Sequence, residues 1–589
     1  MASFHASLSI SSIKQPPFVP YNNISTMPRT NFISKQGYNF SQNGYLTIFS
    51  KQNVNLSEKG KLKDKDIRIR HAKSLKEVKQ ILGSMVKQNP VEGLSMIDSI
   101  QQLGIEYHFE DEIQAVLQRQ QLMFGFQTYR GNDDHELSEV ALQFRLLRQE
   151  GYWVHANVFD NFMEGEGKLK QKFWGNIEGL TGLFEASQSS IEGENCLDEA
   201  GNLSRQLLNA WVSRFHDHPK AKAIANTLRN PTHKSLSKFM PENIKFENSL
   251  WTSSLQELSQ LDTHVMSSLQ LKEIFAVSKW WKELGLAKDL KYARDEPIKW
   301  YMWPMACLPG PHFSEERIEL TKPLSLVYII DDIFDVYGSI EELTLFTNAV
   351  SRWNLEAMEQ LPDYMKACYK ALYDITNEFA LKVQRKHGWN PKDTLIKSWM
   401  RLCNAFLEEA KWFNSGHLPK AGEYLKNGIV SSGVQLVLLH TFFLMGEGIN
   451  KETVSIMDGF PTLISSTATI LRLQDDLEGI KDEKQGEKDG SYMKCYMKEH
   501  PEVSAEETIK LMNEKISDAW KRLNRDRMIT PTNPFPSSFT KICLNTARMV
   551  PIMYGYESNS PSRLEEYVKS LLYYGRDQLK GSPQDHALV

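Results

Sequence analysis

Hydrophobic positions recur with the spacing of an α-helix through most of the chain. Val140, Phe144 and Leu147, for example, fall on one face of a helix at 100° per residue. Glycine and proline residues interrupt this pattern in short segments, which is typical of loops between helices. No stretch shows the alternation of polar and apolar residues that indicates a half-buried strand. The pattern therefore predicts an all-α fold.

The chain also shows where such a fold would divide. Its 589 residues exceed the size at which a single core stops growing, so two domains are expected. A basic segment with proline and asparagine residues runs from His218 to Pro241, and a further polar stretch ends before Leu271. Such segments are typical of a join between two units. We therefore expect helical domains at residues 58–270 and 271–589.

The first 57 residues have the composition of an organelle targeting peptide. They contain ten serines and no acidic residue, and their positive charges are Lys14, Arg29, Lys35 and Lys51. Leaders that are rich in serine and poor in acid are typical of import into a plastid or, second, a mitochondrion. We expect a disordered plastid transit peptide, with a merely disordered tail as the alternative.

The overall composition argues against two classes of function. Lys and Arg total 69 and Asp and Glu total 73, so the net charge of −4 gives no field that would attract nucleic acid. The six cysteines lie at least 35 residues apart and form no zinc-binding pattern, which fits a reducing compartment.

One segment is long and apolar enough to raise the question of a membrane. The 20 residues from Asn427 to Gly446 contain no charged side chain. Polar residues such as Ser431, Gln435 and His440 interrupt it, which favours a buried helix beside a cavity. We therefore expect no membrane span.

Three aspartates stand in the apolar helical segment from Leu324 to Tyr337. Asp331 and Asp335 project one turn apart on nearly the same side of a helix, and Asp332 is rotated away. The segment has no Lys or Arg to neutralise them, and an unpaired buried carboxylate is costly. Oxygen ligands grouped in this way suit Mg²⁺ or Mn²⁺. The alternative, an acidic face exposed to water, is disfavoured by the apolar residues on all sides.

A second acidic helix is predicted from Ile470 to Glu483. Asp475, position 479 and Glu483 follow at i, i+4 and i+8, a ladder of roughly 12 Å at 1.5 Å per residue. Arg472 precedes Asp475 by one turn, so a cation and carboxylates converge where a phosphate-rich ligand could lie. A single ladder of this kind is more often a solvated surface. Two ladders in one apolar half of the chain favour a metal site.

These motifs resemble those of the plant terpene synthase family. The run from Asp331 to Asp335 is similar to the family's aspartate-rich DDxxD motif, and Asp475 to Glu483 is similar to its second metal motif, (N/D)DxxSxxxE. The block from Trp280 to Asp295 resembles the family's lead into the active site. Further similarity, at Glu139 to Tyr152 and Leu183 to Ser187, extends the resemblance over the chain from about residue 65.

The resemblance implies an N-terminal helical barrel without a catalytic role and a C-terminal class I helical bundle that acts as a monomer. Three divalent ions, Mg²⁺ or Mn²⁺, would bind a prenyl diphosphate in the bundle. The implied metal ligands are Asp331, Asp332, Asp335, Asp475 and Glu483. Arg294 and Arg472 match the diphosphate-binding arginines, while Trp303 and Tyr556 would line the pocket for a carbocation.

Three departures from the family's motifs narrow the expected product. The first tryptophan is Trp153, so the arginine-tryptophan element near the start of many cyclic-monoterpene synthases has no counterpart. The family's RxR pair reads Arg294, Asp295, Glu296. Position 479 is glycine where serine or threonine is usual, so water would complete that metal shell. The pattern resembles the subfamily that releases acyclic tertiary alcohols such as linalool and nerolidol.

The expected reaction is ionisation of geranyl diphosphate, followed by attack of water on the allylic cation to give linalool and diphosphate. A plastid address favours this C10 substrate in the stroma, whereas retention in the cytosol favours farnesyl diphosphate and nerolidol. Use of both substrates, or an acyclic product such as ocimene or myrcene, is a further alternative. The chain has no DxDD run, so we do not expect protonation-initiated cyclisation.

Two other classes of protein stand as alternatives. A chain-elongating prenyltransferase also uses aspartate-rich helices but normally carries a second DDxxD motif in place of the Asp475 ladder. A non-catalytic helical scaffold would have no physical need to keep Asp331, Asp335, Asp475 and Glu483 in apolar surroundings. The sequence therefore favours a diphosphate lyase.

Overall fold

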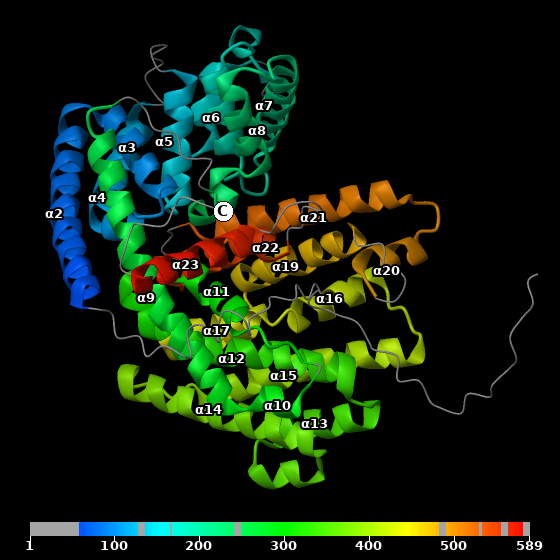
Figure 1. Ribbon diagram of the computed structural model, residues 1–589. Coiled ribbons are helices and arrows are strands. Elements are labelled where there is room, and N and C mark those ends of the chain that lie inside the picture. Colours follow the sequence, from blue (N-terminus) through cyan, green and yellow to red (C-terminus); the bar gives the residue numbers. More distant parts are fainter. Residues whose placement is uncertain are drawn as a thin grey trace, which may run out of the picture.

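The computed structural model is almost entirely helical, which confirms the all-α prediction (Figure 1). The residues that it describes are 58–127, 136–164, 168–240, 249–291, 293–481, 490–528, 533–554 and 563–580. The predicted leader, residues 1–57, lies outside them. One small hairpin was not expected, because β1 (Met163–Glu164) pairs antiparallel with β2 (Lys168–Leu169). Strands of two residues are too short to leave an alternating pattern.

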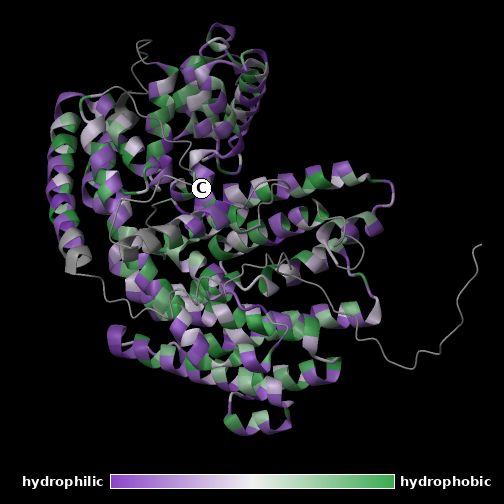
Figure 2. Cartoon of the chain, in the orientation of Figure 1, coloured by the Kyte–Doolittle hydropathy of each residue, from purple (hydrophilic) through white to green (hydrophobic). Residues whose placement is uncertain are grey.

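The first half of the chain forms a compact group of helices that wraps one hydrophobic core (Figure 1). Its helices are α2 (Glu58–Gln88), α3 (Pro90–Gln102), α4 (Glu110–Gln127), α5 (Leu137–Gln149), α6 (Ile177–Ser187), α7 (Asn195–Arg214) and α8 (Pro219–Arg229). Its short 3₁₀ helices are η1 (Glu106–His108), η2 (Ala156–Phe162), η3 (Gln171–Phe173) and η4 (Thr232–Lys234), and η5 (Ser237–Phe239) follows with Phe239 packed into the second core. Figure 2 shows α2, at the edge of this group, as mainly hydrophilic.

The second half forms a larger bundle with its own core. It begins with α10 (Leu286–Asp289), α11 (Pro297–Cys307), η7 (Pro311–Phe313), α12 (Ser314–Asp332), η8 (Ile333–Tyr337), α13 (Ile340–Arg352), η9 (Leu355–Gln360), α14 (Asp363–His387) and α15 (Lys392–Ser415). It continues with α16 (Ala421–Ser431), α17 (Val434–Met445), α18 (Lys451–Asp458), α19 (Thr462–Lys481), α20 (Tyr492–Glu499), α21 (Ala505–Asp526), α22 (Ser537–Tyr554) and α23 (Arg563–Lys580). At its centre α12 contacts α11 and α17, and α19 contacts α17 and α22.

A single long helix, α9 (Thr252–Leu284), joins the two cores. Leu255 and Leu258 belong to the first core, whereas Ile274 and Val277 belong to the second. The expected division near residue 270 therefore falls within a continuous helix and not in a loop. We place the boundary between residues 258 and 274, where the helix passes from one core to the other, as a proposal.

Buried polar contacts hold the two halves together. Nε2 of His233, in η4, lies 2.8 Å from Oδ1 of Asn524 on α21, and the Asn524 amide donates to the carbonyl of Ser190 at 2.9 Å. Nε of Arg548, on α22, donates to the carbonyl of His233 at 2.7 Å. Buried hydrogen bonds of this kind fix the orientation of one surface against another, because breaking them leaves polar groups unsatisfied.

The apolar run that raised the question of a membrane lies inside the second core. Within the described residues two helical segments, Ala421–Met445 and Lys451–Ile480, are long and apolar enough to cross a membrane. The first is interrupted between α16 and α17 by Gly433, whose φ is 71°, and 78% of its most apolar window is buried. Neither segment is a clear membrane span, in agreement with the prediction of a buried helix.

An ion pair in the second core links α9 to α12. Nε and Nη2 of Arg317 lie 2.7 and 2.6 Å from the two carboxylate oxygens of Glu273, and both side chains are almost completely buried. The hydroxyl of Tyr301 donates to the same carboxylate at 2.6 Å. Nη1 of Arg317 donates to the carbonyls of Leu308 and Gly310. The pair is therefore fully hydrogen-bonded, as a buried pair must be to offset its desolvation.

We expect Arg317→Met to lower the free energy of unfolding by about 3–5 kcal/mol, because it leaves the Glu273 carboxylate buried without its cation. Urea denaturation followed by tryptophan fluorescence measures this change. The matched control is Lys279→Met, which removes an exposed ion pair between Lys279 and Glu283 on α9, at 3.9 Å. This substitution should lower the free energy of unfolding by less than about 1 kcal/mol. Equal effects of the two substitutions would contradict the assignment.

Candidate active site

The first acidic segment lies at the end of α12 and in the following π-helical turn, η8. Asp331 is 1% exposed, Asp332 is 2% exposed, and Asp335 is half-buried. These aspartates therefore do not form the water-exposed acidic face that was the alternative interpretation. The π turn was not predicted, and it changes the regular helical relation of Asp335 to Asp331 because it takes more residues per turn.

Arg294 supplies the positive charge that this segment lacks. Its backbone N–H and its Nε donate to Oδ2 of Asp332 at 2.7 and 3.0 Å, and its Nη2 lies 2.9 Å from Oδ1. Nη2 is also 2.5 Å from Oδ2 of Asp331 and donates to the carbonyl of Tyr328 at 3.0 Å. Arg294 thus engages both oxygens of Asp332 and one oxygen of Asp331. The role of Asp332 as a metal ligand stays a prediction; in the structure both of its carboxylate oxygens contact Arg294.

The altered RxR pair places two acids, Asp295 and Glu296, directly after Arg294. Oδ1 of Asp295 accepts a hydrogen bond from the indole N–H of Trp281 at 2.7 Å. Glu296 pairs with Lys299 at 3.4 Å. Both acids therefore have local partners within the second half of the chain, and Arg294 is the arginine of this segment that reaches the aspartates.

Asp331 carries negative charge that the described protein groups do not fully compensate. Burial, together with the neighbouring Asp332, raises its pKa to about 6 in spite of the opposing effect of Arg294 and Arg472. Its Oδ1 is buried and accepts no hydrogen bond from any described residue. A carboxylate oxygen in this state, among other carboxylates, is the kind of ligand that Mg²⁺ and Mn²⁺ bind. The residues present therefore fit the predicted metal.

The second acidic segment lies on α19. Asp475 is 6% exposed, and its Oδ2 lies 3.7 Å from Nη1 of the fully buried Arg472. The adjacent Asp476 has a different role, because it accepts hydrogen bonds from the Tyr424 hydroxyl at 2.9 Å and from the Tyr492 backbone N–H at 2.8 Å. Asp476 thereby ties α19 to α16 and to the start of α20. Asp475, in contrast, forms an ion pair with Arg472 on the same helix.

The two other predicted positions of this segment are Glu483 and Gly479. Glu483 lies outside the described residues, so its predicted role as a metal ligand stays a prediction. At Gly479 no atom of the described residues, apart from its chain neighbours and its own helix backbone, lies within 4 Å of the position that a Cβ would occupy. A serine side chain would therefore fit at position 479 without displacing a neighbour.

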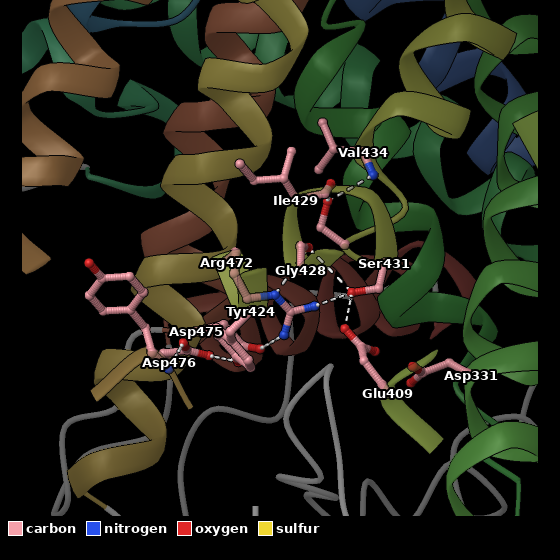
Figure 3. Close-up of polar contacts among 12 residues, drawn as sticks. Asp331, Glu409, Tyr424, Gly428, Ile429, Ser431, Val434, Arg472, Asp475 and Asp476 are labelled. Carbon is pink, nitrogen blue, oxygen red and sulfur yellow. Dashed lines mark hydrogen bonds and ion pairs between the residues drawn. The ribbon is translucent and has the colours of Figure 1, made fainter. Parts of the chain in front are cut away.

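Arg472 rests against the end of α16 (Figure 3). Its Nε donates to the carbonyl of Gly428 at 3.2 Å, and its Nη2 donates to Oγ of Ser431 at 3.2 Å. A Cβ at position 428 would lie 3.0 Å from Nε of Arg472, so the glycine permits this close approach. The end of α16 therefore sets the position of the guanidinium.

The charges of the two segments act on one another across a common region. The pKa of Glu409, on α15, is raised to about 7. Burial and Asp331 raise it, and Arg472 lowers it. Figure 3 shows Glu409 between Asp331 on one side and Ser431, at the end of α16 that Arg472 contacts, on the other. The structure therefore brings Asp331 of α12 near Arg472 of α19, and the roles of both in binding metal and diphosphate stay predictions.

An aromatic wall adjoins this charged region. Trp303, on α11, is buried, and its Nε1 donates to the hydroxyl of Tyr328 at 2.9 Å. The ring centroid of Tyr554, on α22, lies 6.5 Å from that of Trp303. Aromatic faces attract cations, and burial excludes bulk water. Tyr556, which was predicted to belong to this wall, lies outside the described residues.

Four residues of this site were not predicted from the sequence: Tyr328, Glu409, Ser431 and Tyr554. Tyr328 precedes Asp331 by three residues on one helix, so helical spacing was a signal that could have found it. Ser431 was noted only as a polar interruption of an apolar run. Glu409 and Tyr554 carry no local signal, because α15 and α22 reach the site only through tertiary packing.

Two family models match the chain. The model described as "Terpene synthase, N-terminal domain" matches residues 43–228, and "Terpene synthase family, metal binding domain" matches residues 282–522. The second match contains the predicted metal ligands on α12 and α19, together with Arg294, Trp303 and Arg472.

Plant proteins of known name are similar over most of this chain. A protein of Glycine max named neryl diphosphate diphosphatase, chloroplastic, is 53% identical over 86% of this chain and 95% of its own length. An (E)-nerolidol synthase of Cannabis sativa is 48% identical over 82% and 88% of the two chains. The S-(+)-linalool synthase, chloroplastic, of Arabidopsis thaliana is 46% identical over 85% and 88%.

Solved structures show the same architecture. Isoprene synthase from grey poplar, Populus x canescens, in complex with three Mg²⁺ ions and dimethylallyl-S-thiolodiphosphate, has a TM-score of 0.77 at 30% identity, over 87% of this chain and 97% of that chain. Limonene synthase with 2-fluorolinalyl diphosphate has a TM-score of 0.79 at 28% identity, over 88% and 96%. With these likenesses along both halves, and with buried acids and arginines in the half that matches the metal-binding domain, the chain belongs to the plant terpene synthase family.

Proposed function

We propose that this terpene synthase ionises geranyl diphosphate with Mg²⁺ and releases linalool after water captures the allylic cation. The observation that carries the proposal is the set of buried carboxylates on α12 and α19, which lie with two buried arginines beside an aromatic wall. The names of the linalool and nerolidol synthases among the relatives support an acyclic tertiary alcohol as the product.

The charged end of the site would bind the diphosphate. Asp331, Asp335 and Asp475 would hold Mg²⁺, with Glu483 as a further ligand and Mn²⁺ as the alternative ion. When bound, such ions neutralise the charge that develops on the leaving diphosphate. The structure of poplar isoprene synthase is a complex with three Mg²⁺ ions, which supports the same number here. Arg294 and Arg472 would contribute N–H donors to the diphosphate, because guanidinium groups bind phosphate oxygens strongly.

The aromatic end of the site would receive the hydrocarbon chain. Breaking the C–O bond leaves both electrons on the diphosphate and a cation spread over C1 and C3 of the chain. Trp303 and Tyr554 offer aromatic faces to this cation, and their burial limits the access of bulk water. A water molecule that attacks C3 and loses a proton to the solvent or the diphosphate gives the tertiary alcohol.

The alternatives differ in substrate and compartment. A second proposal is nerolidol from farnesyl diphosphate, alone or beside linalool, because a relative bears that name. A third is the use of neryl diphosphate, because the soybean relative at 53% identity is named for that substrate. Ocimene or myrcene would result from loss of a proton before water attacks. The relatives named as chloroplastic support a plastid, and we propose the stroma, with the cytosol as the alternative.

We expect purified protein with Mg²⁺ and geranyl diphosphate to form linalool as its main product. Gas chromatography on a chiral column, after reaction in ¹⁸O-labelled water, measures the product and the origin of its oxygen. Label in the hydroxyl supports capture of a cation by water at carbon. Parallel reactions with neryl and farnesyl diphosphate decide between the alternatives, and longer diphosphates formed after addition of isopentenyl diphosphate would instead indicate a prenyltransferase. Inertness towards all three substrates would favour a non-catalytic scaffold.

We expect Asp331→Ala to lower kcat/KM by at least about a hundredfold, or roughly 3 kcal/mol, because it removes a metal ligand. Circular dichroism should show an unchanged fold, since Asp332 still holds Arg294. Asp374→Ala is the control, because Asp374 is exposed and pairs with Lys370 on α14. An Asp331→Ala enzyme as active as the wild type would contradict the metal assignment.

We expect Gly479→Ser to lower the Mg²⁺ concentration for half-maximal rate by at least about threefold, or ~0.7 kcal/mol, because the hydroxyl adds a ligand oxygen. The open space at position 479 admits the side chain. Gly479→Ala fills the same space without the oxygen and should leave the metal titration unchanged. Identical titrations of the serine and alanine variants would show that position 479 does not face the metal.

A further inference from the structure

Glu409 is a buried carboxylate that belongs to neither acidic segment. It lies on α15, is 4% exposed, and accepts hydrogen bonds at Oε1 from the Ser431 hydroxyl at 2.6 Å and from the Asn427 amide at 3.0 Å. Its Oε2 is buried and accepts no hydrogen bond from any described residue. Figure 3 shows the carboxylate directed towards Ser431 and Asp331. A buried acid that also faces another acid is costly, so its retention needs a reason.

The Ser431 hydroxyl connects Glu409 to Arg472. A serine hydroxyl has one hydrogen and two lone pairs, so donating the hydrogen to Glu409 leaves the lone pairs for other donors. Nη2 of Arg472 uses one of them at 3.2 Å. Without Glu409 the hydroxyl could turn to the carbonyl of Gly428 at 3.3 Å, which is the acceptor that Nε of Arg472 uses. The carboxylate therefore sets the direction of the hydroxyl that receives the guanidinium.

Glu409 also fixes the end of α16 as a platform. The Asn427 amide donates both to Glu409 and to the carbonyl of Ala405 at 3.0 Å, and both acceptors lie on α15. Ser431 is the last residue of α16, and Gly433 begins the turn into α17. The two contacts of Arg472, at Gly428 and Ser431, are therefore made to a helix end that α15 holds in place.

We propose that Glu409 is a positioning residue that aims Arg472 at the substrate diphosphate by fixing the Ser431 hydroxyl. The inference rests on the proposed function only in taking a diphosphate as the ligand of Arg472. It assigns no contact between Glu409 and the substrate. The prenyl chain and its products do not enter into it, so it holds for any prenyl diphosphate.

The test measures the affinity of the full-length protein for inorganic diphosphate in the presence of Mg²⁺, by isothermal titration calorimetry. We expect Glu409→Leu, which removes the acceptor of the Ser431 hydroxyl, and Ser431→Ala each to weaken binding by about tenfold, the size of effect seen when groups that orient a binding residue are removed. The double variant should also lose about tenfold and not a hundredfold, because both changes break one relay. Glu408→Leu is the matched control, since Glu408 lies half-exposed on α15 beside Lys411.

Each outcome bears on the assignment. Additive losses in the double variant would show that Glu409 acts by a route other than Ser431. A lowered unfolding temperature with unchanged affinity would show a merely structural role for Glu409 and would overturn the proposal. Wild-type binding of diphosphate without turnover of any prenyl diphosphate would contradict the proposed function but leave the effect of Glu409 measurable. The two failures are therefore distinguishable.

Discussion

The burial of carboxylates inside an apolar helical bundle is the constraint on which the second half of this protein depends. Asp331, Asp332 and Asp475 are each less than a tenth exposed, and an unpaired buried carboxylate is costly. Arg294 offsets this cost from the loop before α11, and Arg472 offsets it from α19. The packing of α11, α12 and α19 therefore brings both arginines to these acids. Asp331 and Asp332 lie far from Arg294 in the sequence, whereas Asp475 follows Arg472 by three residues.

The same principle explains why the charged side chains of the site are held by many hydrogen bonds. Each arginine has both a carboxylate partner and a backbone carbonyl, at Tyr328 for Arg294 and at Gly428 for Arg472. Asp476 is engaged by Tyr424 and by the backbone of α20. Donors and acceptors that are already held in place need no rearrangement when charge develops on a leaving group, which is the physical basis of electrostatic preorganisation.

Much of this arrangement could be predicted from the sequence, because it depends on local spacing. The helical pattern gave the fold class, and the acids of both ladders stand at intervals that a helix converts into one face. Arg294 was found through a resemblance alone, since nothing local connects it to Asp331. The π turn at Asp335, the change of core within α9 and the bonds of Asp476 arise from tertiary packing. Glu409 and Ser431 were missed for the same reason, because their significance lies in a hydroxyl that only the folded chain places beside Arg472.

The balance of charge around the site suggests an order of binding. Asp331, Asp332, Asp335, Asp475, Asp476 and Glu409 outnumber Arg294 and Arg472 by six to two. Burial and the neighbouring Asp332 raise the pKa of Asp331 to about 6, and burial and Asp331 raise that of Glu409 to about 7, although Arg472 lowers both. Under the proposed function, a diphosphate alone would add charge of the same sign and be repelled at short range. Divalent cations held by Asp331, Asp335 and Asp475 would therefore bind before or together with the substrate, and Arg294 and Arg472 would act on a ligand whose charge is largely neutralised.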